Sequence, residues 1–521
     1  MKVQLTLFLF LSLVVKISSA QVARTFVDFN DTRALFQNNG FFAFNDQLSF
    51  PAYEIPKGGG NHTIFVFSPI WIGQIDDSLV GTAAIYESQN AFSGPVASDY
   101  SDPWHEDRRR MYTAYKAQID NHIQNWEDPN YVVPDEVLEW PAMGNPALNT
   151  SQYNAPFVDF NGSGVYEPKS GDYPLITGDI AVFAIYSYDV NPIDNDLNNT
   201  EFPLEVQVMA YQFASSDEWL NQTTFLNYRV KNRSNKTIED FQWGSYVDID
   251  IGYAFDDFFG SDSTRNLVYG YNGPDFDPGG FGGPGYGQNP PAQGVVLLNK
   301  DMYAANKMTY SGIHDLNNLV NLYNLMQGRN SAGAPNLDSQ GNTTRFIYKE
   351  PPYINGSESM HQLGLEEDVQ RNIISAAPVD LAPGASECYH YAFVYGRNFT
   401  DHLLSVEEVI NRTDSVQQFY DENIDLPCDF YNGSMNTTSF EKEDQLSIYP
   451  NPTNNQISIK SNQPITGVKI YSSEGKLSFE NSFEVTKAHT LDLSSLQKGV
   501  YIVNVYYQNG THSFRRVVKN E

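Results

Sequence analysis

The residues with the clearest potential for chemistry are aspartates that crowd into one short stretch. The sequence YVDIDIGYAFDDFFGSDSTRN, residues 246–266, carries five of them among aromatic and aliphatic side chains. If residues 241–251 form a strand, alternate side chains point to opposite faces. Asp248 and Asp250 then share one face, about 6.5 to 7 Å apart at their Cα atoms, and a cation or solvent must relieve their repulsion. The other face is apolar: Phe241, Trp243, Val247, Ile249 and Ile251.

The residues after this strand can bring more carboxylates to the same place. Two aspartates follow Gly252, and a third follows Gly260. A loop that folds back over the strand end would gather several carboxylates, and oxygen-only ligands suit Ca²⁺, which takes six to eight of them. The first interpretation is a structural calcium site with the ligands Asp248, Asp250, Asp256, Asp257 and Asp262.

Two other interpretations of these aspartates stay open. The acids could be solvated on an outer face of an acidic protein, where they serve only solubility. Alternatively, two of them could act as catalytic acid and base, because glycosidases use paired carboxylates about 5 to 10 Å apart. The candidates for such a pair are Asp248, Asp250, Asp256 and Asp257.

A second acidic segment, DFNGSGVYEPKSGD at residues 159–172, follows the spacing of a calcium-binding loop. Polar side chains occupy positions one, three and five, and Gly164 occupies position six, where the chain must turn sharply. Ser170 replaces the bidentate glutamate of position twelve, although an aspartate lies two residues further on. A plain Asx-type turn is the alternative. The calcium ligands would be Asp159, Asn161, Ser163, the carbonyl of Val165, Glu167 and Asp172.

Sequence motifs of common catalytic sites are not found. The chain has no His-Glu-x-x-His zinc helix, no Gly-x-Ser-x-Gly nucleophile elbow and no Gly-Lys-Ser/Thr phosphate loop. The nine histidines do not pair at metal-ligand spacing. With 63 Asp and Glu against 32 Lys and Arg, the formal net charge is −31. This charge argues against nucleic acid as a partner, because a phosphate backbone would be repelled.

The elements that position these acids are expected to be mainly strands. At 521 residues the chain should hold two or three domains. An aromatic content of 14%, with 37 Gly and 28 Pro, favours many short strands joined by turns. Amphipathic spacing predicts a few helices, within residues 106–124, 316–328 and 405–420. In the last of these, Ser405 and Glu408 have capping-box spacing.

The N-terminus and the cysteines indicate an oxidising destination. Residues 1–20, MKVQLTLFLFLSLVVKISSA, combine a lysine, an apolar run and small residues, as a secretory signal peptide does. No later stretch is long enough and apolar enough to predict a transmembrane helix. Cys388 and Cys428 are the only cysteines, and we expect a disulfide that closes a loop of about forty residues. One buried and one exposed free thiol is the alternative.

The composition of the chain changes at residue 446. Residues 447–521 carry eight Lys or Arg and five Asp or Glu, whereas the preceding chain is strongly acidic. Apolar and polar residues alternate around Ile457 and from Tyr501 to Tyr507, and the pairs Asn-Pro, Glu-Gly and Lys-Gly separate these segments. The pattern predicts a small antiparallel β-sandwich.

This C-terminal segment resembles a known family. The motifs YPNPTNNQISI, VKIYSSEGKL and LDLSSLQKGVYIVNV, followed by a basic final strand, look like the type A sorting domain of the type IX secretion system of Bacteroidota. The resemblance implies an Ig-like β-sandwich at residues 446–521 that engages the secretion machinery. It also implies export through the periplasm and across the outer membrane, followed by release or attachment to the cell surface. Residues 431–445 would then be a linker, and residues 21–430 the secreted body of one or two subdomains.

The body resembles another group of proteins over residues 65–384. The motifs FVFSPIWIG, WPAMGNP, FPLEVQVMAYQFA and DVQRNIISAAPVDLAPG, together with both acidic segments, look like those of uncharacterised secreted Bacteroidota proteins with the same tail. That resemblance supplies no reaction.

Together these features predict a mainly β, multi-domain secreted protein with β-sandwich elements. The leading hypothesis is a calcium-stabilised binding or adhesion module for glycans or surface proteins. The alternatives are a polysaccharide-acting hydrolase and a structural component of the cell surface or matrix.

Overall fold

The computed structural model divides into two compact units, residues 1–434 and 435–521. The expected signal peptide and the expected linker lie outside the described residues. The residues that the structure describes are 22–83, 91–188, 204–280, 283–308, 316, 318–424, 428, 446–451, 453–472, 476–508 and 512–520.

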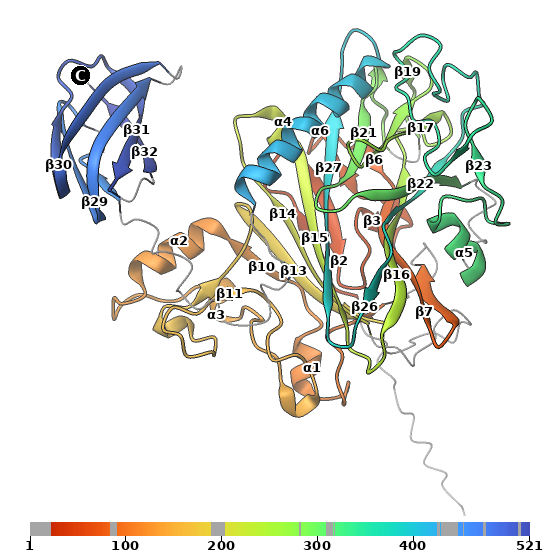
Figure 1. Ribbon diagram of the computed structural model, residues 1–521, viewed down its shortest axis with the longest axis horizontal. Helices are drawn as coiled ribbons and strands as arrows, with labels where there is room; N and C mark the ends of the chain where they lie inside the picture. Colours follow the sequence, from red (N-terminus) through yellow and green to blue (C-terminus); the bar gives the residue numbers. More distant parts are fainter. Residues whose placement is uncertain are drawn as a thin grey trace, which may run out of the picture. The chain divides into compact units, whose positions relative to one another are not determined.

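The body is built around two antiparallel sheets, as Figure 1 shows. In the larger sheet the order is β10-β13-β14-β15-β27-β21-β18-β17, with β9 pairing to β13. Its strands are β9 (Phe92–Ser93), β10 (Tyr112–Tyr115), β13 (Ile180–Ser187), β14 (Leu204–Gln212), β15 (Thr223–Asn232), β17 (Asp257–Asp262), β18 (Leu267–Asn272), β21 (Ala292–Leu297) and β27 (Ser386–Gly396).

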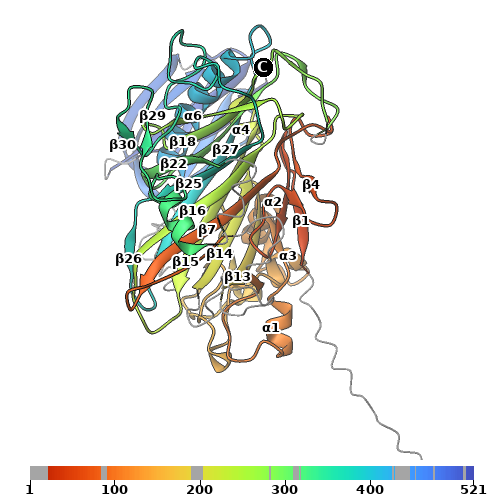
Figure 2. The same cartoon turned by 90° about the vertical axis from the view of Figure 1, so that its right-hand side faces the viewer.

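The smaller sheet has the order β22-β25-β16-β7-β8, with β26 also pairing to β16. The long strands β7, β14, β15 and β16 run in a similar direction in Figure 2, as in aligned sandwiches. The strands of this sheet are β7 (Val66–Ile75), β8 (Ser78–Ala83), β16 (Ile238–Ile249), β22 (Met302–Met308), β25 (Gln370–Ala376) and β26 (Val379–Leu381).

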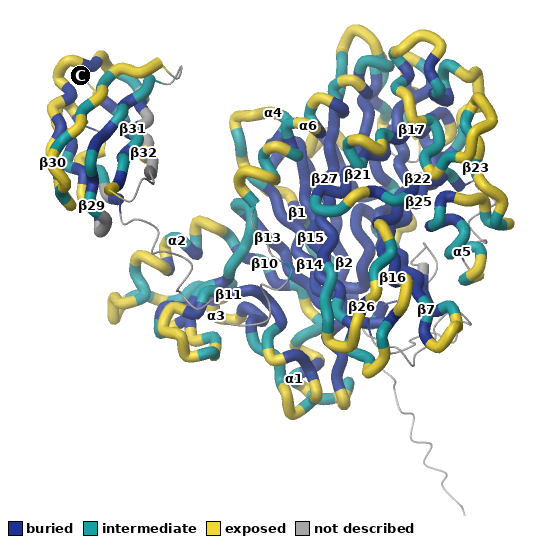
Figure 3. Tube along the Cα trace, viewed as in Figure 1, coloured by how far each residue is buried: buried dark blue, intermediate teal, exposed yellow. Residues whose placement is uncertain are grey.

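Aromatic side chains fill the space between the two sheets. Trp243 of β16 stacks on Tyr389 of β27, with ring centroids 5.6 Å apart. Phe67 of β7 meets Tyr391 of β27 at 5.1 Å, edge to face. The long strands are accordingly buried along most of their length, and exposure concentrates in the loops at their ends (Figure 3). Large rings that contact across the layers are a major part of such a core.

Helices cover the outer faces of both sheets. On the smaller sheet, α5 (Leu319–Met326) packs Leu322 and Met326 against residues of β7, β16 and β25. On the larger sheet, α6 (Leu404–Asn423) packs against β18, β21 and β27. It lies very close to β27, because a Cβ atom on Gly396 would be 2.6 Å from the backbone nitrogen of Val409.

Two helix predictions need correction. The stretch 106–124 is not one helix: β10 pairs with β13 and buries Tyr112 and Ala114, and α2 (Lys116–Asn125) follows it. The apolar residues at its start also fit the alternation of a strand, and pairing with β13 makes that part a strand and not a helix. The capping box is wrong as well, since α6 begins at Leu404 without a side-chain cap. The Ser405 hydroxyl donates to the carbonyl of Pro290 instead, at 3.0 Å.

Short elements complete the body. One further sheet has the order β1-β2-β5-β6 (Arg24–Val27, Arg33–Gln37, Tyr53–Glu54, His62–Ile64). Four pairs of short strands form hairpins: β3 with β4 (Phe44–Asn45, Phe50–Pro51), β11 with β12 (Phe157–Val158, Tyr173–Pro174), β19 with β20 (Phe276–Asp277, Gly287–Gln288) and β23 with β24 (Asn336–Leu337, Thr343–Thr344). The short helices are α1 (Pro103–Asp107), α3 (Asp135–Leu138), α4 (Glu218–Asn221) and the 3₁₀ turns η1 (Pro146–Leu148) and η2 (Pro168–Ser170).

The C-terminal unit is entirely β in its described residues. Its order is β28-β29-β31-β32, and β30 pairs with β29. The first part of β29 pairs with β28 and its second part with β31, while β30 follows it along both parts. Ile457, Ile470, Val503 and Val517 belong to its own apolar core. The strands are β28 (Ser447–Tyr449), β29 (Gln456–Ser472), β30 (Leu477–Asp492), β31 (Gly499–Tyr507) and β32 (His512–Lys519). The mainly β fold class is thus confirmed.

Candidate functional site

Strand β16 and the residue that follows it place Asp248 and Asp250 on one face, opposite the core between the sheets. Trp243, Val247 and Ile249 point into that core, as the alternation predicted. The face that carries the two aspartates is buried too, with exposed fractions of 2% and 4%. Tyr246, two residues before Asp248 on the same face, belongs to an apolar cluster with residues of α5, and Phe65 packs against that cluster.

The chain then folds back and brings two further aspartates to the strand end. The backbone N–H of Ile251 donates to Asp257 Oδ2 at 2.9 Å. The reversal uses Gly252, which has a φ of +67° and lies so close to Asp277 that a Cβ atom would be 1.9 Å from Oδ2. Asp256 is 7% exposed and Asp257 is fully buried. The interpretation of these acids as solvated is therefore wrong.

Asp277 belongs to the same group, although the sequence reasoning missed it. It is 1% exposed, and its carboxylate accepts the backbone N–H groups of Tyr253 at 3.0 Å, Gly279 at 2.9 Å and Tyr286 at 2.6 Å. The signal in the sequence is an aspartate directly before Pro-Gly-Gly, which is typical of a side chain that closes its own turn. We call Asp248, Asp250, Asp256, Asp257 and Asp277 the acidic cluster.

Burial and mutual repulsion raise the pKa values of four members of the acidic cluster. Burial raises the pKa of Asp248 to about 7, although Arg371 opposes the shift. The pKa of Asp250 is raised well above its usual range by burial and then by Asp248. That of Asp257 is raised by burial and then by Asp250. Burial, and after it Asp277 and Glu367, raises the pKa of Asp256 to about 7.

The acidic cluster has few partners for its charge. Arg371, on the neighbouring β25, places Nε 3.5 Å from Asp248 Oδ2, and its side chain is 10% exposed. Four buried carboxylate oxygens have no hydrogen-bond partner among the described residues: the Oδ1 atoms of Asp248, Asp250, Asp256 and Asp257. Buried carboxylates that lack partners are costly unless they are protonated or bind a cation.

Asp262, predicted as a ligand of the same ion, does not join the acidic cluster. It lies at the far end of β17, five residues after Asp257 and therefore about 16 Å away along a strand. Its carboxylate pairs with Arg265 at 2.8 Å and accepts the Thr264 N–H at 2.9 Å. Burial opposes ionisation there, but the hydrogen bonds from Thr264 and Arg265 outweigh it and lower the pKa.

The segment 159–172 forms the turn that its glycines predict. Gly164 has a φ of +76°. The two oxygens of Asp159 accept the backbone N–H groups of Ser163 at 3.0 Å and Gly164 at 2.7 Å. Those of Asp172 accept the N–H groups of Phe160 at 2.8 Å and Glu167 at 2.7 Å. Since all four oxygens have partners, this loop closes on its own hydrogen bonds.

The other predicted ligands in this loop are arranged loosely. Asn161 Nδ2 donates to Glu167 Oε2 at 3.3 Å. The Ser163 hydroxyl donates to the carbonyl of Val165 at 3.1 Å. Asn161, Ser163, Val165 and Glu167 are exposed, so the loop offers an ion no enclosed set of oxygens.

We predict that Asp172→Asn destabilises the body by about 2 to 3 kcal/mol, because an amide cannot accept both backbone N–H groups and leaves a buried donor unpaired. The measurement is the free energy of unfolding in urea. Asp120→Asn is the matched control: Asp120 only pairs with Lys116 on the surface of α2, at 2.7 Å, and should cost about 0.5 kcal/mol or less. Equal losses in the two variants would contradict the role given to Asp172.

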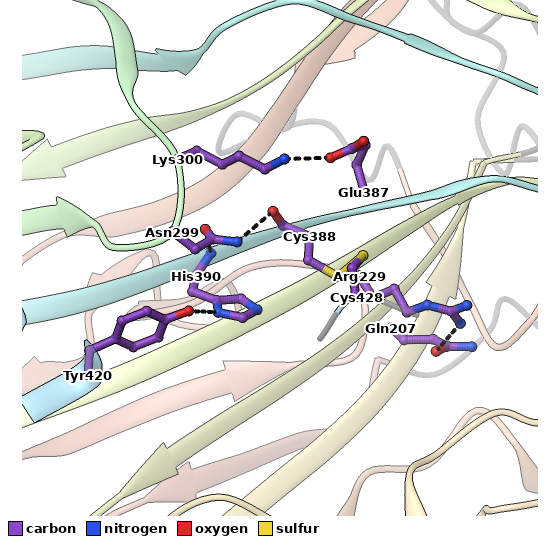
Figure 4. The surroundings of a disulfide bond; sticks show 9 residues. All are labelled: Gln207, Arg229, Asn299, Lys300, Glu387, Cys388, His390, Tyr420 and Cys428. Atoms are coloured by element: carbon purple, nitrogen blue, oxygen red, sulfur yellow. Dashed lines mark hydrogen bonds and ion pairs between the residues drawn. A yellow bond between two sulfur atoms is a disulfide. The ribbon is translucent and has the colours of Figure 1, made fainter. Parts of the chain in front are cut away.

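Cys388 and Cys428 are joined by a disulfide. Figure 4 shows it on β27, beside Arg229 of the adjacent β15. His390, two residues along β27, contacts the hydroxyl of Tyr420 on α6, and its burial lowers the pKa to about 3. The histidine is therefore neutral and acts in packing.

Two geometric facts limit the chemistry of the acidic cluster. In the part of the chain that the structure describes, no three or more His, Cys, Asp or Glu side chains are arranged closely enough to hold a metal ion. No carboxylate of the cluster is more than 7% exposed, so a polysaccharide chain could not reach a catalytic pair here. The geometry therefore favours a role inside the protein over hydrolysis.

The C-terminal unit defines the class of protein. Residues 447–520 match the family described as the secretion system C-terminal sorting domain. The chain thus carries a type IX sorting domain, which directs its export and its release or surface attachment. Within the described residues, no helix has both the length and the apolar character needed to cross a membrane.

No curated protein matches the chain. Among solved structures, a polysaccharide lyase is 8% identical with a TM-score of 0.18, over 63% of this chain and 36% of that chain. A putative aldose 1-epimerase from Escherichia coli K12 is 8% identical with a TM-score of 0.27, over 73% and 100%. The heparan sulfate lyase HepC from Pedobacter heparinus is 10% identical with a TM-score of 0.21, over 90% and 41%. These similarities are too low to define the fold of the body.

Proposed function

We propose that this protein is a secreted or surface-attached binding module whose body is stabilised by one Ca²⁺ ion at the acidic cluster. The sorting domain supports the location. The observation that supports the ion is the set of four buried Oδ1 atoms without hydrogen-bond partners, on Asp248, Asp250, Asp256 and Asp257.

The charge of the acidic cluster leaves two ways to neutralise it. Arg371 can offset one carboxylate, and Asp277 is held by three backbone N–H groups. The other three carboxylates must either keep protons or share a cation. Calcium suits such a set, because it accepts six to eight oxygens in flexible geometry. Ion binding would require the side chains of the cluster to rotate toward one another.

The test is thermal unfolding of the purified protein at pH 7.5, with calcium and with a chelator. Bound calcium stabilises only the folded chain, by about 2.7 kcal/mol when its free concentration is a hundred times the dissociation constant. We expect the midpoint of the body to rise by roughly 3 °C. The double variant Asp248→Asn/Asp250→Asn should lose this response.

Asp159→Asn serves as the control, because it alters the loop 159–172 and leaves the acidic cluster intact. It should lower the midpoint but keep the calcium response. Equal midpoints of the unaltered protein with calcium and with chelator would remove the ion from the proposal. If Asp159→Asn, and not the double variant, lost the calcium-dependent rise of the midpoint, the ion would bind in the loop 159–172.

A further inference from the structure

Exposed aromatic side chains gather near the acidic cluster. Their exposed fractions run from 38% to 74%. Two come from the loop between Asp250 and Asp256, one directly precedes Asp277, and one follows β27. β17 and β19, which flank these loops, lie at the same end of the body in Figure 1. We call the four side chains the aromatic surface: Tyr253, Phe255, Phe276 and Phe399.

One ring contact and one backbone hydrogen bond relate the first three residues of this surface. The centroids of the Tyr253 and Phe255 rings are 5.7 Å apart. The backbone N–H of Tyr253 donates to Asp277 Oδ1 at 3.0 Å, which places this loop beside the β19–β20 hairpin. In β19, Asp277 is buried and Phe276, its neighbour, is 51% exposed. The loop and the hairpin therefore present their rings from adjacent segments.

Phe399 extends this surface and already carries a cation. The guanidinium of Arg397 lies 4.8 Å from the centroid of the Phe399 ring. The same guanidinium donates to the carbonyls of Gln288 at 3.1 Å and Asn289 at 2.9 Å, and Gln288 pairs with Phe276 in the hairpin. Among the described residues, no lysine or arginine lies over Tyr253, Phe255 or Phe276.

Exposed carboxylates lie on segments next to those that carry the rings. Asp275 is exposed and accepts Gln288 Nε2 at 3.0 Å. Glu367 is exposed and lies against Gly273. His402 Nε2 contacts the carbonyl of Gly273 at 2.9 Å, and the side chain of the adjacent Asp401 is 50% exposed. Burial lowers the pKa of His402, so this histidine adds no positive charge at neutral pH.

We propose that the aromatic surface binds an arginine-bearing segment of a partner polypeptide. Charge complementarity carries the inference, because aromatic faces and carboxylates both attract a cation. Guanidinium groups stack on rings better than ammonium groups do, and the contact of Arg397 with Phe399 is the same interaction made within the chain. The inference names the partner of the proposed binding module, and it needs the ion only to keep the loop 250–257 in place.

The experiment measures binding of a fluorescently labelled peptide of alternating arginine and glycine to the full protein, by anisotropy, in constant calcium. We expect saturable binding that weakens with salt. Phe255→Ala and Phe276→Ala should each weaken it about two- to five-fold, and Asp275→Asn should weaken it and reduce its salt dependence. The corresponding lysine peptide should bind less tightly than the arginine peptide.

Controls separate the aromatic surface from the net charge of the body. Leu48→Ala and Val132→Ala remove exposed apolar side chains elsewhere, 71% and 81% exposed, and should leave binding unchanged. Equal affinity in the phenylalanine variants and in these controls would overturn the proposal, as would tighter binding of a neutral glycan or an amino-sugar polymer. Because calcium is constant, failure here leaves the thermal test of the ion untouched.

Discussion

In the presence of a chelator, the body should become more stable as the pH falls from 8 to 5. The acidic cluster is the reason, because burial raises the pKa of Asp248 from 3.8 to about 7. Between these two values the folded chain holds a proton that the unfolded chain has released. Stability therefore falls as the pH rises through this window. As the pH falls from 7 to 5, the gain corresponds to roughly 3 kcal/mol for Asp248 alone.

Urea unfolding at several pH values measures this slope. Asp248→Asn should make the slope shallower, because an amide does not titrate, and Asp256, whose pKa is also raised to about 7, keeps part of it. Asp262→Asn is the matched control in the same stretch: its pKa is lowered by Thr264 and Arg265, so removing it should leave the slope between pH 5 and 8 in place. Saturating calcium should also flatten the slope, since the ion competes with the protons. A chelated body that gains stability toward pH 8 would contradict the charge assignment.

Breaking the disulfide should lower the free energy of unfolding by about 4 kcal/mol. The bond closes a loop of forty residues and so reduces the conformational entropy of the unfolded chain. The double variant Cys388→Ala/Cys428→Ala uses alanine, because serine would bury a hydroxyl at position 388. Its free energy of unfolding in urea, compared with that of the oxidised protein, gives the loss directly.

Reduction of the unaltered protein is the control for side-chain effects. It should lower the free energy of unfolding as much as the double alanine variant does. If the reduced protein and the double alanine variant each lose less than about 1 kcal/mol, the loop that ends at residue 428 is already restricted in the unfolded chain. The explanation by loop entropy would then be wrong.

Local alternation predicted the faces of β16 correctly, since Trp243, Val247 and Ile249 do point into the core. It could not predict that the opposite face is buried. The cover comes from α5 and from the segment around Phe65, both remote in the sequence. The residue pattern of one strand cannot predict packing by segments so distant in the sequence.

The acidic cluster was predicted in part for the same reason. The reversal at Gly252, which brings Asp257 back to Ile251, lies within ten residues and could be anticipated. Asp277 and Arg371 arrive from distant segments and could not. Asp262 was predicted to join the acidic cluster because nothing in its spacing indicates that β17 runs straight on from Asp257.

The covalent link of Cys388 to Cys428 encloses the whole of α6, since the helix begins at Leu404 and ends at Asn423. Among the described residues of the body, α6 is the last helix, and it is consequently attached to the larger sheet on both sides of its span. A cut in the chain after residue 428 would leave both of these attachments in place.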